Sequence, residues 1–326
     1  MIVKDGALAG RKRLMVRRAM AAVFALVALA LLVQWTGLAL RPDRVPEGGS
    51  TVPDNENRIL GEVGDTASAL TGTIHIEGLG AFTFDPGEVK TVRPDMFREG
   101  YFSIFDVLVH LADRGQIDLE YSFAEAMNTH VVKNLSGHSW WWYDAYYDGG
   151  WRERSVFRMD HYPYKDNMTL NLVKVTPQHL EPVYRTYRDE VERLQAHGGR
   201  VIVPEVVIIG RRETLVFRDV EVRAHNLRSD MFQPGVVTAI DTILSLAEAG
   251  KITYDLQWYE SIGSAGVVKS YWVNRISLDA SLGRCGFVYE AGDETFEFFR
   301  GNHNHIPSDI RVINSPQYVK YFWICI

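Results

Sequence analysis

Histidine side chains are the first candidates for chemistry, because imidazole binds metal ions and transfers protons near neutral pH. His303 and His305 alternate in the segment 302–305. Alternate side chains of an extended segment point the same way, so both rings could reach one metal ion. The spacing nominates no third ligand, and a polar loop without metal is the alternative. We therefore expect no cofactor and no metal site, with His303 and His305 as the weak candidates.

A histidine beside a carboxylate could instead act as a general base. His130 and His138 are followed by Asp144 and Asp148. Such a base usually activates a serine or cysteine in a recognisable context. The sequence has no Gly-x-Ser-x-Gly run and no Cys–His–Asn pattern. We therefore expect no enzymatic activity and no catalytic residue.

The densest aromatic stretch lies between Trp140 and Trp151. On a strand, alternate residues face opposite ways, so half of this run can fill a core while the other half reaches the surface. Exposed rings of this size usually cover a neighbouring module, a partner protein or a ligand. The candidate binding surface consists of Trp140, Trp142, Tyr146, Tyr147 and Trp151.

Two stretches, 135 positions apart, predict the helices and strands that carry these side chains. The windows 95–119 and 230–254 are identical at nine of 25 positions, which indicates an internal repeat. Each has a hydroxyl-x-x-acid sequence at a helix start, then apolar residues at helical spacing, then period-two alternation. Each copy should form a short buried helix and a half-buried strand. An aromatic hairpin should follow, with turns at Asp148–Gly149 and Ala291–Gly292.

The order of capped helix, strand, Val-Val-Lys segment (131–133 and 267–269) and aromatic strand resembles the transcobalamin C-terminal-like domain, a β-grasp-type module. Two tandem copies would cover about two thirds of the chain. The turns depart from the Asn-Gly expected in the family. The resemblance implies a helix packed on a mixed or antiparallel sheet. Corrinoid binding is not implied, because the large helical domain beside this module in the vitamin carriers has no counterpart in this sequence.

The N-terminal part shows a membrane pattern. Residues 1–18 are basic, and residues 19–40 contain no charged side chain. Twenty-two residues at 1.5 Å rise can span a hydrocarbon core of about 30 Å, and the basic flank should stay in the cytoplasm. A cleaved signal peptide is the alternative, with a small-x-small site at 37–39. We expect an uncleaved anchor in the bacterial inner membrane, with the bulk of the chain in the periplasm.

Composition limits the other partners. The net charge is −6 and the pI is about 5.9, which argues against nucleic acid, because phosphate binding needs clustered basic residues. Cys285 and Cys325 are the only cysteines. Outside the cytoplasm they could form one disulfide, and buried free thiols are the alternative.

These observations predict an α+β fold with one N-terminal transmembrane helix and two repeated β-grasp-like modules. The expected segments are a cytoplasmic stretch, a membrane helix, a tether, module 1, a linker helix and module 2, over 1–18, 19–40, 41–70, 71–178, 179–200 and 201–326. We predict a non-enzymatic accessory or scaffold subunit, tied to the bilayer through residues 19–40 and to other subunits of a respiratory, photosynthetic or secretory complex. A tethered small-ligand receptor and a metal-dependent enzyme are the alternatives.

Overall fold

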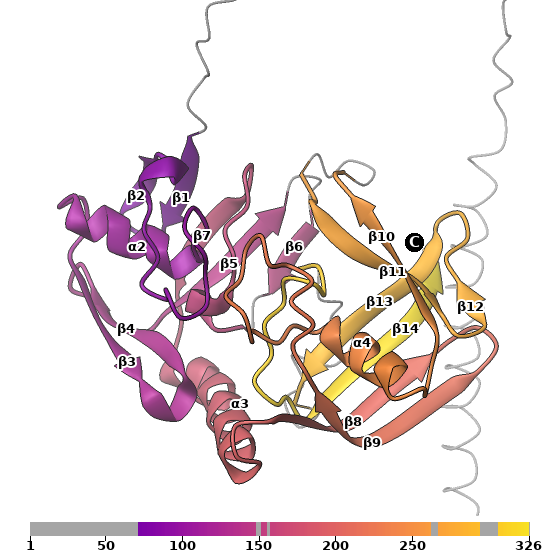
Figure 1. Ribbon diagram of the computed structural model, residues 1–326. Helices are drawn as coiled ribbons and strands as arrows, with labels where there is room; N and C mark the ends of the chain where they lie inside the picture. The colour runs from indigo at the N-terminus through magenta and orange to yellow at the C-terminus, as the bar shows by residue number, and fades with distance from the viewer. Residues whose placement is uncertain (1–70, 148–150, 155–156, 262–266, 294–305, 326) are drawn as a thin grey trace, which may run out of the picture. The chain divides into compact units, whose positions relative to one another are not determined.

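The computed structural model describes residues 71–325, except 148–150, 155–156, 262–266 and 294–305. Two modules follow one another in this part, the first over residues 72–174 and the second over residues 201–325. Helix α3 (Pro177–Ala196) joins them. Strands outnumber helices, so the described fold is mostly β, with three α-helices (Figure 1).

The first module is built on a five-stranded sheet with the order β2-β1-β7-β5-β6. Its first and last strands, β1 and β7, are parallel neighbours, and the remaining pairs are antiparallel. The strands are β1 (Gly72–Ile76), β2 (Gly80–Phe84), β5 (Trp141–Tyr147), β6 (Trp151–Arg154) and β7 (Thr169–Lys174).

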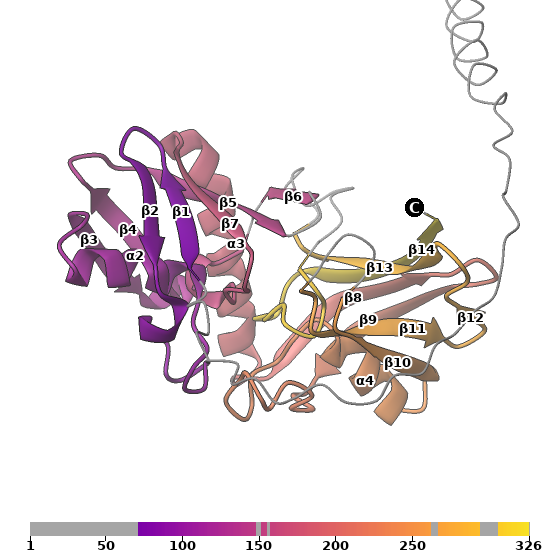
Figure 2. The same ribbon diagram turned by 90° about the horizontal axis from the view of Figure 1, so that it is seen from above.

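The second module has a four-stranded sheet with the order β13-β14-β8-β9. Its first and last strands, β8 and β14, are again parallel neighbours, while β9 and β13 pair antiparallel on either side. Apart from β6, the strand order and directions are the same in both modules (Figure 2). The strands are β8 (Val201–Ile209), β9 (Thr214–Val222), β13 (Cys285–Gly292) and β14 (Tyr318–Cys325).

One helix contributes to the core of each sheet, and a hydroxyl–acid pair fixes its start. At α2 (Ile104–Asp113), Ser103 N donates to Asp106 Oδ2 at 2.6 Å, and Asp106 N donates back to Ser103 Oγ at 3.3 Å. At α4 (Asp241–Glu248), Thr238 N and Oγ1 donate to Asp241 Oδ2 at 2.7 and 2.9 Å. The apolar faces behind these pairs belong to the two cores, with Phe105, Leu108 and Leu111 in the first and Ile240, Ile243 and Leu246 in the second.

A separate small sheet stands beside each main sheet. Strands β3 and β4 form a two-stranded hairpin in the first module, and β10, β11 and β12 form a three-stranded sheet in the second. The sequence predicted half-buried strands here. Tyr121, Phe123 and Trp258 are instead exposed, because these strands lie outside the main sheets. The bounds are β3 (Leu119–Ala124), β4 (Thr129–Leu135), β10 (Tyr254–Tyr259), β11 (Ser270–Ile276) and β12 (Asp279–Ala280).

The modules meet through equivalent residues. Phe97 and Phe232, which are 135 positions apart, form an antiparallel bridge, and their ring centroids lie 5.5 Å apart. Arg98 N donates to the carbonyl before Phe232 at 2.9 Å, and Gln233 N donates to the carbonyl before Phe97 at 2.8 Å. Such reciprocal contacts are the signature of a local two-fold relationship.

The predicted fold class needs correction at its N-terminal element. No helix in the part of the chain that the structure describes is long and apolar enough to cross a membrane. The single transmembrane helix is therefore not part of the described fold, which is two β-rich modules with three short helices. The predicted span, residues 19–40, lies outside the described residues.

One local prediction is also wrong, and one helix differs in its bounds. The linker helix, predicted over 179–200, spans Pro177–Ala196 after the Thr176 cap. The expected turn at Ala291–Gly292 is strand, because β13 continues to Gly292, opposite Tyr318 of β14. The long apolar β14 supplies a pairing partner for every residue of β13, so the strand extends through the glycine.

Candidate interaction site

A buried arginine organises the surface of the first module. Arg93 is 4% exposed, and its guanidinium binds the buried Asp160 at 3.1 Å. It also forms a bidentate ion pair with Asp95, in which Nε and Nη2 donate to the two carboxylate oxygens at 2.9 and 2.8 Å. The ring of Phe123, on β3, lies over the same guanidinium at 5.5 Å. One arginine thus holds an internal carboxylate, an external carboxylate and an aromatic ring.

The second module repeats this arrangement. Arg228 is 5% exposed and binds the buried Asp309 at 3.0 Å. It forks onto Asp230 through Nε and Nη2, both at 2.9 Å. Trp258, on β10, lies over its guanidinium at 5.3 Å. Arg228, Asp230 and Trp258 are each 135 positions after their counterparts, so the repeat carries the arginine, the external acid and the ring.

The buried carboxylates also fix the hairpins. Asp160, in the short 3-10 helix η3 (Met159–His161), accepts the backbone N–H of His130 on β4 at 2.9 Å. Asp309 accepts the backbone N–H of Tyr271 on β11, also at 2.9 Å. The rings of His130 and Tyr271 then pack against the exposed aromatic residue of their own module, at 5.0 Å from Phe123 and 4.9 Å from Trp258.

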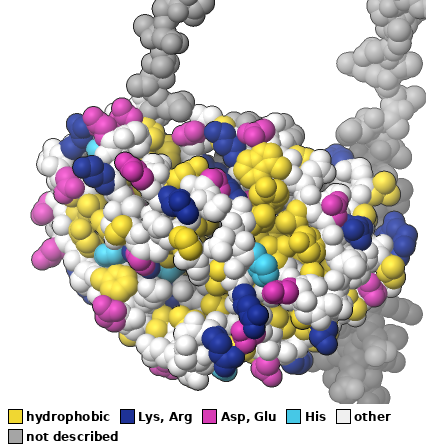
Figure 3. All heavy atoms as spheres, in the orientation of Figure 1, with side chains coloured by type: hydrophobic (Ala, Val, Ile, Leu, Met, Phe, Trp, Pro, Cys, Tyr) yellow, Lys and Arg dark blue, Asp and Glu magenta, His cyan; other side chains and the backbone are white. Residues whose placement is uncertain are grey.

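Each cluster therefore presents a ring and a carboxylate side by side. Phe123 and Trp258 are 37% and 38% exposed, and the carboxylate side chains of Asp95 and Asp230 are 64% and 49% exposed. Hydrophobic side chains are visible over both hairpin regions in Figure 3. We call these two surfaces the hairpin faces. Each is defined by its ring and acid, Phe123 with Asp95 and Trp258 with Asp230.

Electrostatics keep the first cluster ionised, whereas in the second cluster burial raises the pKa of Asp309. Burial lowers the pKa of Arg93, but its bonds to Asp95 and Asp160 outweigh this effect and the net shift is upward. Burial raises the pKa of Asp160, yet its neighbours hold that pKa well below the usual range, among them the His130 hydrogen bond and the charge of Arg93. His161 is buried beside Arg93 and Arg158, and its pKa falls to about 3, so it is neutral at physiological pH. Arg93 and Asp160 thus form a buried ion pair.

One residue from each module reaches into the cluster of the other. Lys165, from the first module, donates to the carbonyl of Val268 and lies 3.4 Å from Ser270 Oγ, beside the Asp309 cluster. Burial lowers the pKa of Lys165 to about 8. Asn314, from the second module, contacts Nδ1 of His161 at 3.4 Å in the Asp160 cluster. The two clusters therefore also join the modules.

The predicted aromatic surface is wrong at Trp142. Trp142 is 6% exposed and Trp141 and Tyr143 are also buried, so three consecutive rings belong to the core. Strand β5 is covered on both faces, since Trp142 packs on Tyr184 of α3 and Tyr143 binds the carbonyl of Phe157. Trp140, before β5, is 46% exposed and Tyr146 is half-buried. The side chains of Tyr147 and Trp151 lie outside the described set.

The remaining candidate residues, the histidines and aspartates, do not come together in one site. His130 pairs with Asp160, Nδ1 to Oδ2 at 2.9 Å, and not with Asp144 of β5. No group of three metal-ligating side chains occurs among the described residues. The candidates His303 and His305, like Asp148, lie outside the described residues.

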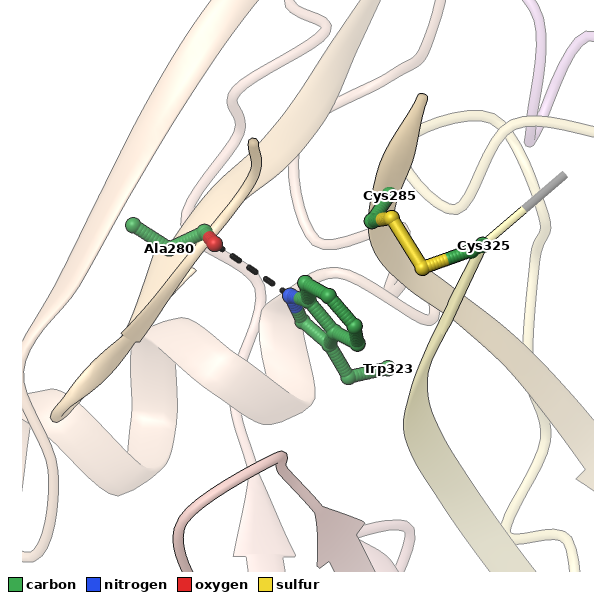
Figure 4. Close-up of a disulfide and its surroundings, with 4 residues drawn as sticks. All are labelled: Ala280, Cys285, Trp323 and Cys325. Atoms are coloured by element: carbon green, nitrogen blue, oxygen red, sulfur yellow. Dashed lines mark hydrogen bonds between the residues drawn. A yellow bond between two sulfur atoms is a disulfide. The ribbon is translucent and has the colours of Figure 1, made fainter. Parts of the chain in front are cut away.

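Cys285 and Cys325 are bonded as a disulfide (Figure 4). They face each other in the antiparallel register of β13 and β14. The disulfide lies near Trp323, whose indole N–H donates to the carbonyl of Ala280 at 3.2 Å. It therefore fastens the end of the last strand to an edge strand of the second sheet.

Sequence reasoning missed the arginines and the buried acids. A signal for the arginines exists, because Arg93 and Arg228 stand two positions before the repeated Asp-Met-Phe and form an Arg-x-Asp-Met-Phe motif. Asp160 and Asp309 are 149 positions apart, outside the constant offset of the repeat. Only the fold shows that they are equivalent.

A pocket beside α3, lined by residues such as Trp141, Trp142 and Tyr187, has room for little more than a water molecule. No protein-family model, curated protein or solved structure matches this chain. The resemblance to transcobalamin C-terminal-like modules therefore stays a prediction.

Proposed function

We propose that this protein is a non-enzymatic accessory or scaffold subunit that binds a partner protein through its two hairpin faces. The observation that carries this proposal is the duplicated surface pair, Phe123 with Asp95 and Trp258 with Asp230, each built on a buried arginine. A buried arginine cluster alone would stabilise a module without exposing a ring. Keeping an exposed ring at the same place in both repeats favours recognition.

The chemistry of the hairpin faces favours a partner with basic side chains. An exposed aromatic ring attracts a cation over its face, and a carboxylate fixed by an arginine fork accepts hydrogen bonds from lysine or arginine. Asp95 and Asp230 are held in place before binding, so little side-chain entropy is lost. Two such faces on one chain raise the apparent affinity for a partner that presents two basic segments.

The histidine most suited to catalysis serves a structural role in this proposal. His130 is 12% exposed at its side chain, binds Asp160 and packs against three aromatic rings, those of Phe105, Tyr121 and Phe123. Such a histidine orients the hairpin. The disulfide between Cys285 and Cys325 favours a location outside the reducing cytoplasm, which is where we place the protein.

The size of the native assembly tests the proposal. We expect the full chain, isolated from its own cells in mild detergent, to run in an assembly larger than the monomer. The double variant Phe123→Ser/Trp258→Ser should release it as a monomer, whereas Val216→Ser, on exposed β9, should leave the assembly intact. A monomer from the unaltered chain at every salt concentration, or an assembly that both variants preserve, would contradict the proposal.

A further inference from the structure

The end of the second module that carries the disulfide exposes isolated aliphatic side chains. Leu278, in the turn between β11 and β12, is 61% exposed, and Leu282, in the loop before β13, is 68% exposed. Ile209, at the end of β8, is 40% exposed. We call this end of the module the tip. Figures 1 and 2 both show β12, the β8–β9 turn and the end of β14 together there.

Hydrogen bonds tie the turns of the tip together. Arg212 N, in the β8–β9 turn, donates to Asp279 Oδ2 of β12 at 2.9 Å. Leu282 and Cys285 exchange backbone hydrogen bonds at 2.8 and 3.0 Å. Trp323 binds the carbonyl of Ala280, next to the disulfide (Figure 4). The exposed leucines are therefore held outward by the fold.

Arginines predominate among the exposed charges around these leucines. Arg211, Arg212 and Arg284 are all exposed. Of the nearby acids, Asp279 is 2% exposed and Glu213 is half-buried. Asp255 of β10 is exposed and accepts a hydrogen bond from Asn274 Nδ2 at 2.9 Å. The full chain carries a net charge of −6, so this basic end contrasts with the molecule as a whole.

We propose that the tip binds an anionic lipid surface. Leucines at the crests of separate turns can enter the boundary between headgroups and acyl chains, while flanking arginines bind the lipid phosphates. A protein interface would favour a flat patch rich in aromatic residues. This tip instead carries separate exposed aliphatic side chains with arginines around them. Within the second module, the exposed arginines give this end the charge that an anionic surface attracts.

The first module provides the matched comparison. Its equivalent β1–β2 turn also exposes a leucine, Leu79, at 38%. The turn carries Glu77 and no arginine, and Gly137 stands at the position that corresponds to Leu278. The leucine–arginine combination is thus specific to the second module.

Fluorescence from a polarity-sensitive label tests the proposal on the full chain. Leu278→Cys and, as control, Leu79→Cys are labelled with a nitrobenzoxadiazole thiol reagent, because the native cysteines are joined in the disulfide. Vesicles of phosphatidylcholine with phosphatidylglycerol should raise and blue-shift the emission at position 278 severalfold more than at position 79. Any other part of the chain that binds vesicles would bring both labels near the surface, but only tip contact immerses position 278.

A second variant tests the charges. Arg211→Gln/Arg284→Gln, placed in the labelled Leu278→Cys chain, should reduce the emission change severalfold, and Arg212 is kept because it contacts Asp279. High salt should also reduce the emission change, because it screens the charges of the arginines and the lipid phosphates. Equal responses at positions 278 and 79, or a response unaffected by the arginine substitutions, would overturn the proposal. A response to polyglutamate without one to vesicles would assign the tip to an acidic polypeptide and would also overturn it.

Discussion

Phe97 of the first module packs against Phe232 of the second, with ring centroids 5.5 Å apart, and the two residues occupy the same place in the repeat. Both are buried, and the backbone around them exchanges hydrogen bonds in both directions. The modules are therefore joined by the same contact viewed from either side. We therefore expect a substitution of one ring to alter the contribution of the other ring to stability.

Replacing Phe97 with Ala should lower the free energy of unfolding by about 3–5 kcal/mol, because a large buried ring leaves a cavity. The double variant Phe97→Ala/Phe232→Ala should cost less than the sum of the single variants, with a coupling of about 0.5–1.5 kcal/mol. Urea unfolding of all three variants measures this. Val216→Ala, on exposed β9, serves as control. Strict additivity would argue against direct packing of the two rings.

Replacing Arg93 with Met should destabilise the chain by about 3–5 kcal/mol, because it leaves the buried carboxylate of Asp160 without its cation. Adding Asp160→Asn removes that unpaired charge and should recover part of the loss. Arg200→Met, which breaks an exposed pair with Glu221, should cost far less, because solvent screens that pair. Denaturant unfolding at neutral pH compares them, and equal costs for the two arginines would contradict the cluster's role.

Acid should destabilise the fold through His161. Its pKa falls from 6.5 to about 3 in the folded chain, so the unfolded chain binds the proton more readily between these values. Stability contributed by neutral His161 is thus present above pH 6.5 and is lost as the pH falls toward 3. The slope should approach about 1.4 kcal/mol per pH unit at most. His161→Gln should flatten it, as measured by urea unfolding from pH 7 to 4, and an unchanged slope would exclude His161 as its source.

Reduction of the Cys285–Cys325 disulfide should lower stability, since it releases a closed loop with a sequence separation of 40. The chain-entropy relation gives about 4 kcal/mol for a loop of this length. Thermal unfolding with and without reductant measures the change. Cys285→Ser/Cys325→Ser should match the reduced chain and show no further response. A melting temperature insensitive to reductant would mean that the bond contributes little.

Local patterns in the sequence predicted the helix starts. Ser103 with Asp106 and Thr238 with Asp241 form the expected pairs, because capping depends on residues three apart. Long-range burial could not be read in the same way. We predicted a surface position for Trp142 because strand alternation assumes one covered face, but α3 covers the second face of β5.

The contacts inside the two arginine clusters could not be predicted from local patterns either. Arg93 contacts Asp160 across 67 positions, and no local spacing pairs them. The repeated Arg-x-Asp-Met-Phe motif indicates that the arginine has a fixed role, but its buried partner follows from the topology alone. The exposure of Phe123 and Trp258 was not predicted either, since the period-two pattern assigned their strands to a half-buried sheet.

Site-specific crosslinking tests the central claim that the two hairpin faces bind one basic partner. A photoreactive phenylalanine is placed at Phe123, at Trp258 or, as control, at Val216 of the full chain, in its own cells. We predict adducts to the same partner from positions 123 and 258, at peptides rich in lysine and arginine, and none from position 216. Adducts from position 216 alone, no adduct from either hairpin face, or attachment to acidic peptides would contradict the account.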